Sequence, residues 1–170
     1  MEEKNLWNSY GEEQLKELHE INEKYKDCLD KGKTERECIA LAVEMAKEAG
    51  YRDVKEVMAE GTPLKSGDKV YAVCMEKMIA MFRIGEEPIS NGMNILGAHI
   101  DSPRIDVKQN PLYESEGLAY LDTHYYGGIK KYQWVTGPMA LQGVVAKTDG
   151  SVVNISIGEK ESDPVFVITD

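Results

Sequence analysis

Apolar residues recur at steps of three and four along the N-terminal part of the chain, the spacing that places side chains on one face of a helix. Over residues 11–31 this stripe consists of Leu15, Leu18, Ile21, Tyr25 and Leu29. A second stripe consists of Ile39, Ala42, Val43 and Ala46. Thr34, with Glu37 three residues later, forms a capping box before the second stripe, and Gly50 provides a stop after it. The pattern predicts two helices, the first of which faces a core.

After residue 50 the helical spacing gives way to short β-type runs separated by turns. Residues 70–75 and 78–84 are predicted as two strands joined at Glu76-Lys77, whereas residues 54–58 are ambiguous. Residues 94–100 are predicted as a third strand, and their apolar character predicts burial on both faces, as in a sheet covered by helices. Two helices followed by such a sheet predict an α/β domain. The order of the elements leaves open which strands are parallel.

Strand and turn signals dominate from residue 113 to the end. A loop is expected at residues 109–111, and a turn at residues 148–150. The expected strand segments are 118–121, 125–128, 139–145, 152–157 and 165–168. This part of the chain is therefore predicted to be β-rich.

The third predicted strand ends in a polar pair, His99 and Asp101, and Pro103 then stops the run. Because side chains in a strand alternate between faces, both residues of the pair are expected on the same side. One nitrogen of His99 can then bind a metal ion while the Asp101 carboxylate holds its other N–H. On spacing alone, a surface histidine beside a turn aspartate is the more frequent outcome, since isolated His-x-Asp triplets arise by chance.

The residues around this pair favour the metal-binding interpretation over the surface histidine. Gly97-Ala98-His99-Ile100-Asp101-Ser102-Pro103 is followed by Tyr126-Gly127-Gly128-Ile129, by Trp134 and by the segment 138–145. This order resembles the aspartyl aminopeptidase (vacuolar aminopeptidase I) family of dinuclear zinc exopeptidases, whose members carry an Ala-His-x-Asp-Ser-Pro box, a Tyr-Gly-Gly segment and a Leu-x-Gly-x-Val strand. The resemblance runs from residue 69 to residue 145 and continues weakly over residues 157–166.

The resemblance implies a metal-ligand role for His99 and a catalytic-site role for Asp101, in a site that holds two Zn²⁺ ions. Imidazole and carboxylate ligands would also accept Co²⁺ or Mn²⁺. The resemblance further implies that residues 1–110 are the first part of a zinc-exopeptidase-like α/β/α catalytic domain. Residues 111–170 would then begin an inserted β-rich dimerisation domain. Members of the family form dimers that assemble into a tetrahedral dodecamer, so we expect a homo-oligomer.

The family's bridging Asp, its Glu-Glu pair and its later Asp and His have no counterpart in these residues. A catalytic zinc site needs about three protein ligands per metal and a general base. We therefore expect these 170 residues to be the N-terminal part of a longer protein and to be inactive alone. His19 and His124 are expected to have no metal role, the first on a helix surface and the second among tyrosines.

The composition of the chain limits which classes of partner and which cellular compartment we expect. Twenty Lys and Arg residues against thirty Asp and Glu residues give a formal charge of −10, which argues against nucleic acid and anionic membranes as partners. No apolar run approaches the roughly 18 residues of a membrane span, and the first residues lack the layout of a signal peptide. The three cysteines, Cys28, Cys38 and Cys74, lack Cys-x-x-Cys spacing. We expect buried, reduced thiols in a cytoplasmic protein.

The function most consistent with these features is a metallo-aminopeptidase that removes N-terminal residues from peptides. A related dinuclear zinc peptidase or deacylase is one alternative, because several such groups use a His-x-Asp strand. A non-catalytic assembly module, in which the pair is incidental, is another. Ser102-Pro103 and the Tyr126-Gly127-Gly128 segment favour the aspartyl aminopeptidase group, but they do not fix which N-terminal residue is preferred.

Overall fold

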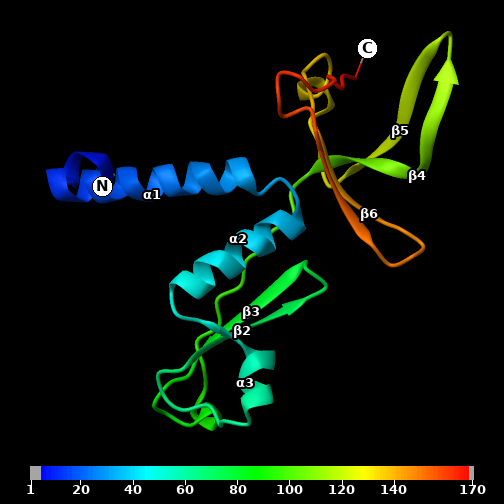
Figure 1. Ribbon diagram of the computed structural model, residues 1–170. Helices are drawn as coiled ribbons and strands as arrows, with labels where there is room; N and C mark the ends of the chain where they lie inside the picture. The colour runs from blue at the N-terminus through cyan, green and yellow to red at the C-terminus, as the bar shows by residue number, and fades with distance from the viewer. Residues whose placement is uncertain (1–4, 169–170) are drawn as a thin grey trace. The chain divides into compact units, whose positions relative to one another are not determined.

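The computed structural model describes residues 5–168 of the chain. The chain divides into two compact units, one ending at Ala98 and the other beginning at His99. The first contains helices and a small sheet, and the second contains two β-hairpins (Figure 1). The assignment of residues 1–110 and 111–170 to a catalytic and a dimerisation domain stays a prediction.

The two predicted helices are present as α1 (Glu12–Lys31) and α2 (Glu35–Glu48), preceded by the short 3-10 helix η1 (Leu6–Ser9). The capping box of α2 forms as predicted. The Glu37 N–H donates to Thr34 Oγ1 at 3.3 Å, and Glu37 Oε2 accepts from the Thr34 N–H at 2.8 Å. Gly50, with φ +83°, follows the end of α2 and adopts the left-handed conformation that favours glycine.

The expectation that α1 faces a core is wrong for this structure. Leu15, Ile21, Tyr25 and Leu29 of its apolar stripe are exposed. The stripe has the right spacing for burial, but packing also requires a facing element. Among residues 5–168, only α2 makes more than marginal contact with α1. The amphipathic pattern therefore identified the helix and not its surroundings.

The first unit contains a three-stranded sheet in the order β1-β2-β3 (Figure 1). Its short first strand, β1 (Arg52–Asp53), runs parallel to β2 (Lys69–Cys74), and β3 (Met78–Arg83) pairs antiparallel with β2. The ambiguous residues after 53 form a helix, α3 (Val54–Glu60), which Asp53 caps by accepting from the Lys55 N–H at 2.8 Å. The core lies where α2, α3 and β2 meet, and consists of Ile39, Ala46, Val57, Val70 and Tyr71.

The prediction of a third strand over residues 94–100 is wrong. After the 3-10 helix η2 (Ile89–Asn91), the chain up to Pro103 has no regular secondary structure. Ile95 is 81% exposed and Leu96 is 99% exposed, so neither face is buried. A strand needs ladder hydrogen bonds from a neighbour, and no described residue pairs with this segment.

The second unit begins with a long antiparallel ribbon formed by β4 (Arg104–Ser115) and β5 (Leu118–Tyr126). The predicted loop at residues 109–111 is wrong, because β4 continues through it. The turn residues instead produce a register shift between Val107 and Leu112. Pro111 has no N–H to give to the ladder, which explains an irregularity at this point. At the tip of the ribbon, Tyr113 and Tyr120 stack with ring centroids 5.2 Å apart.

The second hairpin follows the 3-10 helix η3 (Lys131–Gln133) and consists of β6 (Leu141–Ala146) and β7 (Val152–Ile157). The predicted turn at its end is confirmed, with Asp149 Oδ1 accepting from the Ser151 N–H at 2.8 Å. The last predicted strand is reduced to isolated bridges, in which Phe166 pairs with Met139 and Ile168 with Val135.

Candidate functional site

The candidate site lies at the beginning of the second unit, where the chain enters β4. His99 and Asp101 precede this strand, and Tyr126 ends its partner β5. The ladder pairs Arg104 with Tyr126, which brings the end of β5 beside the segment that carries His99. Beyond Tyr126 the chain turns at Gly127, whose φ of +73° favours glycine, and a Cβ at this position would lie 3.5 Å from Pro103.

His99 and Asp101 are in contact. The Nδ1 atom of His99 lies 2.9 Å from the backbone oxygen of Asp101 and 3.2 Å from its carboxylate Oδ1. Both atoms are acceptors, so Nδ1 carries the hydrogen and Nε2 keeps its lone pair. The His99 side chain is 84% exposed, which leaves Nε2 accessible. This is the orientation a metal-binding histidine needs, although the pair lies on irregular chain and not on a pleated strand.

The other carboxylate oxygen of Asp101 has a partner from β5. The Tyr126 hydroxyl donates to Asp101 Oδ2 at 2.8 Å, across 25 residues of sequence. This hydrogen bond is the main reason that the pKa of the Asp101 carboxyl lies below its ordinary value, and the neighbouring His99 acts in the same direction. Asp101 therefore remains a carboxylate near neutral pH and can hold the His99 N–H.

Arg104 supports this arrangement from the first position of β4. Its guanidinium carbon lies 4.2 Å from the centre of the Tyr126 ring, and its Nε donates to Asp106 Oδ1 at 2.7 Å. Neither Arg104 nor Tyr126 was singled out by the sequence as a residue of the site. Tyr126 belongs to the Tyr-Gly-Gly segment that carried the family resemblance, and that was the one signal pointing to it.

The chemistry of His99 fits a zinc ligand. Zinc-bound histidines commonly donate their second N–H to a carboxylate or a carbonyl oxygen, and His99 faces one of each. Over residues 5–168, however, no three His, Cys, Asp or Glu side chains lie close enough together to hold a metal ion. Among the described residues, His99 and Asp101 are therefore the two whose geometry fits a ligand and the group that would orient it.

The other residues considered from the sequence lie elsewhere. His19 is exposed on α1, and His124 is exposed beside a hollow of about 510 Å³ at the register shift of the ribbon. Cys28 and Cys38 are half-buried, and burial raises the pKa of the Cys38 thiol. Cys74 is exposed, so the prediction that all three thiols are buried is wrong.

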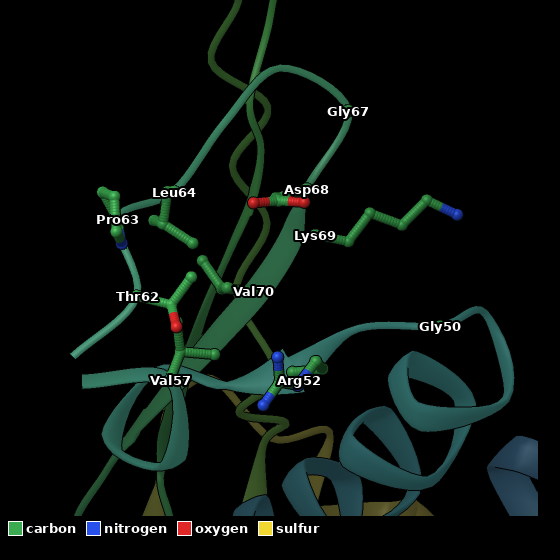
Figure 2. Close-up of a pocket in the computed structure, with 10 residues that line it drawn as sticks. All are labelled: Gly50, Arg52, Val57, Thr62, Pro63, Leu64, Gly67, Asp68, Lys69 and Val70. Atoms are coloured by element: carbon green, nitrogen blue, oxygen red, sulfur yellow. The ribbon is translucent and has the colours of Figure 1, made fainter. Parts of the chain in front are cut away.

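A second hollow, of about 310 Å³, lies in the first unit between β1, β2 and residues 62–67 (Figure 2). Its two cationic side chains already have partners. Arg52 pairs with Glu60, and Lys69 Nζ donates to the Ala49 carbonyl at 2.8 Å. Figure 2 shows the Lys69 side chain extending away from Thr62. The hollow holds no histidine or cysteine, so we do not assign a catalytic role to it.

None of the helices in the described part of the chain combines the length and apolar character needed to cross a membrane.

Comparison with known proteins gives a consistent result. The sequence matches the peptidase M18 family, aminopeptidase I zinc metalloprotease (M18), over residues 28–170. It is 53% identical over 169 residues to a probable M18 family aminopeptidase 1 of Clostridium acetobutylicum, a match that covers 99% of this chain and 36% of the relative. The chain thus spans little more than a third of the length of this relative.

Crystal structures of the same family show the same fold. Aminopeptidase I from Borrelia burgdorferi B31 superposes with a TM-score of 0.90 at 43% identity, covering 98% of this chain and 40% of that chain. The M18 aminopeptidase from Thermotoga maritima superposes with a TM-score of 0.88 at 40% identity, and the match covers 100% of this chain and 36% of that chain. These matches confirm the predicted mixed α/β fold. With the family match over residues 28–170, they show that the chain belongs to the M18 family of aminopeptidase I zinc metalloproteases.

Proposed function

We propose that the full-length gene product is a zinc-dependent aminopeptidase that removes N-terminal residues from peptides. Within it, His99 is a zinc ligand through Nε2 and Asp101 is the carboxylate that orients the ring. The observation that carries this proposal is the contact of His99 Nδ1 with Asp101 at 2.9 and 3.2 Å, in a chain of the M18 family. Two zinc ions per active site are part of the proposal.

The role of each residue follows from its position. Asp101 accepts the Nδ1 hydrogen, which fixes the tautomer of His99 and increases the electron density at Nε2. Because the hydrogen bond from Tyr126 lowers the pKa of Asp101, Asp101 stays a carboxylate near neutral pH and can accept the Nδ1 hydrogen. When bound, zinc polarises the scissile carbonyl and activates a water molecule. The further ligands and the general base would come from outside the described residues.

The test is zinc content and peptide hydrolysis in the full-length His99→Ala variant. We expect turnover of aminoacyl amides to be lost and the zinc content to fall. His19→Ala is the matched control, because His19 is also an exposed histidine and lies on α1. Wild-type zinc content and rate in His99→Ala would refute the assignment.

The substrate panel separates the alternatives. Aminoacyl amides with acidic, basic and apolar side chains report the N-terminal preference, and N-acyl amino acids detect a deacylase. A wild-type protein that binds no zinc and turns over none of these compounds would support the assembly module.

We also propose that the protein is a cytoplasmic homo-oligomer, in which residues 111–170 contribute to a dimer contact and dimers assemble into a dodecamer. The support is that Leu112, Tyr113 and Leu118, apolar or aromatic residues near the tip of the ribbon, are all exposed. Light scattering on the full-length protein tests it. A monomer at micromolar concentration would contradict the proposal.

A further inference from the structure

The hydroxyl of Tyr126 occupies a position that gives it a role in the candidate site. We propose that Tyr126 is a positioning residue, which holds the Asp101 carboxylate so that Asp101 in turn holds His99 in the metal-binding orientation. This inference rests on the proposed function, because it concerns the same histidine.

The two carboxylate oxygens of Asp101 contact different partners. Oδ1 lies 3.2 Å from His99 Nδ1, and Oδ2 accepts from the Tyr126 hydroxyl at 2.8 Å. A carboxylate with one oxygen bound can still rotate about its Cβ–Cγ bond. Held at both oxygens it has one orientation, and the bond from Tyr126 is the shorter of the two. Tyr126 therefore fixes the plane in which Oδ1 meets the histidine.

Asp101 lies on a partly exposed part of the chain without regular secondary structure. Its side chain is 41% exposed, and residues 92–103 form no ladder with any described strand. Water can compete for an exposed carboxylate, and unpaired chain leaves its backbone free to move. The hydrogen bond from Tyr126 connects this segment to β5, whose backbone is paired with β4. Because the ribbon is held by its ladder, this bond limits the motion of the Asp101 side chain.

Tyr126 is itself held in place. Arg104 faces it across the ladder, with the guanidinium carbon 4.2 Å from the ring centre, and Arg104 is fixed by its 2.7 Å hydrogen bond to Asp106. A cation over a tyrosine face is favourable and limits rotation of the ring. Tyr126 is 40% exposed as a residue, so it is not buried in a core that would demand an aromatic residue for packing alone. The specific contribution of this side chain to the site is its hydroxyl.

The experiment compares Tyr126→Phe with Tyr125→Phe in the full-length protein. Tyr126→Phe removes one oxygen and keeps the ring and its contact with Arg104. Tyr125→Phe removes the same atom from the adjacent residue, whose ring lies near Lys131 Nζ, 5.2 Å from the ring centroid. The readouts are zinc affinity, by competition with a chromophoric chelator, and the tautomer of His99 in the zinc-free protein, by nitrogen NMR of the imidazole.

We expect Tyr126→Phe to weaken zinc binding on the order of 10-fold, the lower end of the range for outer-shell partners. The Nδ1-protonated fraction of His99 should fall in the same variant, which a purely structural role would not produce. Tyr125→Phe should leave both quantities unchanged. In an Asp101→Asn background, Tyr126→Phe should add little, because its effect passes through the carboxylate.

Zinc affinity and His99 tautomer that stay at wild-type values in Tyr126→Phe would overturn the inference. So would an effect of Tyr126→Phe that persists in full in the Asp101→Asn background. The two proposals fail differently. If His99→Ala lowers zinc binding while Tyr126→Phe does not, only the role of Tyr126 is wrong. If neither His99→Ala nor Tyr126→Phe changes zinc binding, the ligand assignment of His99 is wrong as well.

Discussion

Asp101→Asn is the substitution that tests most directly how His99 is oriented. It keeps the size and shape of the side chain and removes its charge. In the native protein Asp101 faces two donors, the His99 Nδ1–H and the Tyr126 hydroxyl, and each carboxylate oxygen serves one of them. An asparagine has one acceptor oxygen and one NH₂ group, so it can satisfy only one of these donors in the native geometry.

The loss of zinc affinity in Asp101→Asn depends on which way the new side-chain amide is oriented. With its oxygen towards His99, the bond to Nδ1–H survives without its charge, and the Tyr126 hydroxyl has to rotate and accept. With its NH₂ group towards His99, a donor faces the Nδ1–H, which then keeps only the Asp101 backbone oxygen, at 2.9 Å, as its acceptor, so the ring is held less firmly in the metal-binding orientation. We therefore expect a loss of zinc affinity on the order of 10- to 100-fold, as for other partners of zinc-bound histidines.

The assay is chelator competition on the full-length protein, with the rate of peptide hydrolysis measured in parallel. Asp122→Asn is the control, because it removes an exposed carboxylate from the same ribbon, where Asp122 pairs with Lys108 at 2.9 Å. The reasoning is refuted if Asp101→Asn binds zinc as tightly as the wild type while His99→Ala does not. It is also refuted if Asp122→Asn weakens zinc binding as much as Asp101→Asn.

Two further predictions concern stability. Thr34→Ala removes the acceptor of the Glu37 N–H from the capping box and should lower the free energy of unfolding by about 1 kcal/mol, measured by urea denaturation; an unchanged midpoint would contradict it. Asp163 accepts from the Gly158 and Lys160 N–H groups, which lowers its pKa, so its contribution is present above the unfolded carboxyl pKa of about 3.9 and is lost as the pH falls through the lower folded value. Asp163→Asn should therefore reduce stability at neutral pH more than at pH 2, and an equal loss at both would refute the linkage.

The sequence predicted those elements whose signals are local. The helices α1 and α2, the capping box at Thr34 and the turn between β2 and β3 each depend on residues within one or two turns of chain. The helix α3 could have been recognised by Asp53 at its start and Gly61 at its end, but seven residues give too short an apolar pattern.

Three of the wrong predictions concern the element against which a segment packs or pairs. The apolar stripe of α1 and the apolar run at residues 94–100 have the composition of buried elements, yet both are exposed in this structure. Periodicity identifies a face that is suited to burial, and burial itself depends on another element that the local pattern does not specify. The loop predicted at residues 109–111 fails for the opposite reason, since pairing with β5 carries β4 through residues that favour a turn.

The candidate site likewise combines a contact between residues close in the sequence with a contact between residues far apart in it. The contact between His99 and Asp101 joins residues two positions apart, so it was within reach of a local prediction, although the strand that was expected to carry the pair did not form. Tyr126 lies 25 residues from Asp101, and its approach depends on the register that pairs Arg104 with Tyr126. No pattern within either strand fixes that register, so only the structure could show that Tyr126 belongs to the site.

The orientation of His99 therefore depends on the ribbon and not on the strand that the sequence predicted for it. Residues 92–103 have no ladder partner among the described residues, and the hydrogen bond from Tyr126 to Asp101 connects the end of this segment to the ribbon. The bond comes from the last residue of β5. A change that shifts the register of β4 on β5 would move Tyr126 relative to Asp101 and so release the carboxylate, even where it leaves His99 and Asp101 untouched. The Tyr-Gly-Gly segment thus has a physical reason to accompany the His-x-Asp pair, because its tyrosine completes the hydrogen bonding of the aspartate and Gly127, with φ +73°, adopts the left-handed conformation of the turn that follows β5.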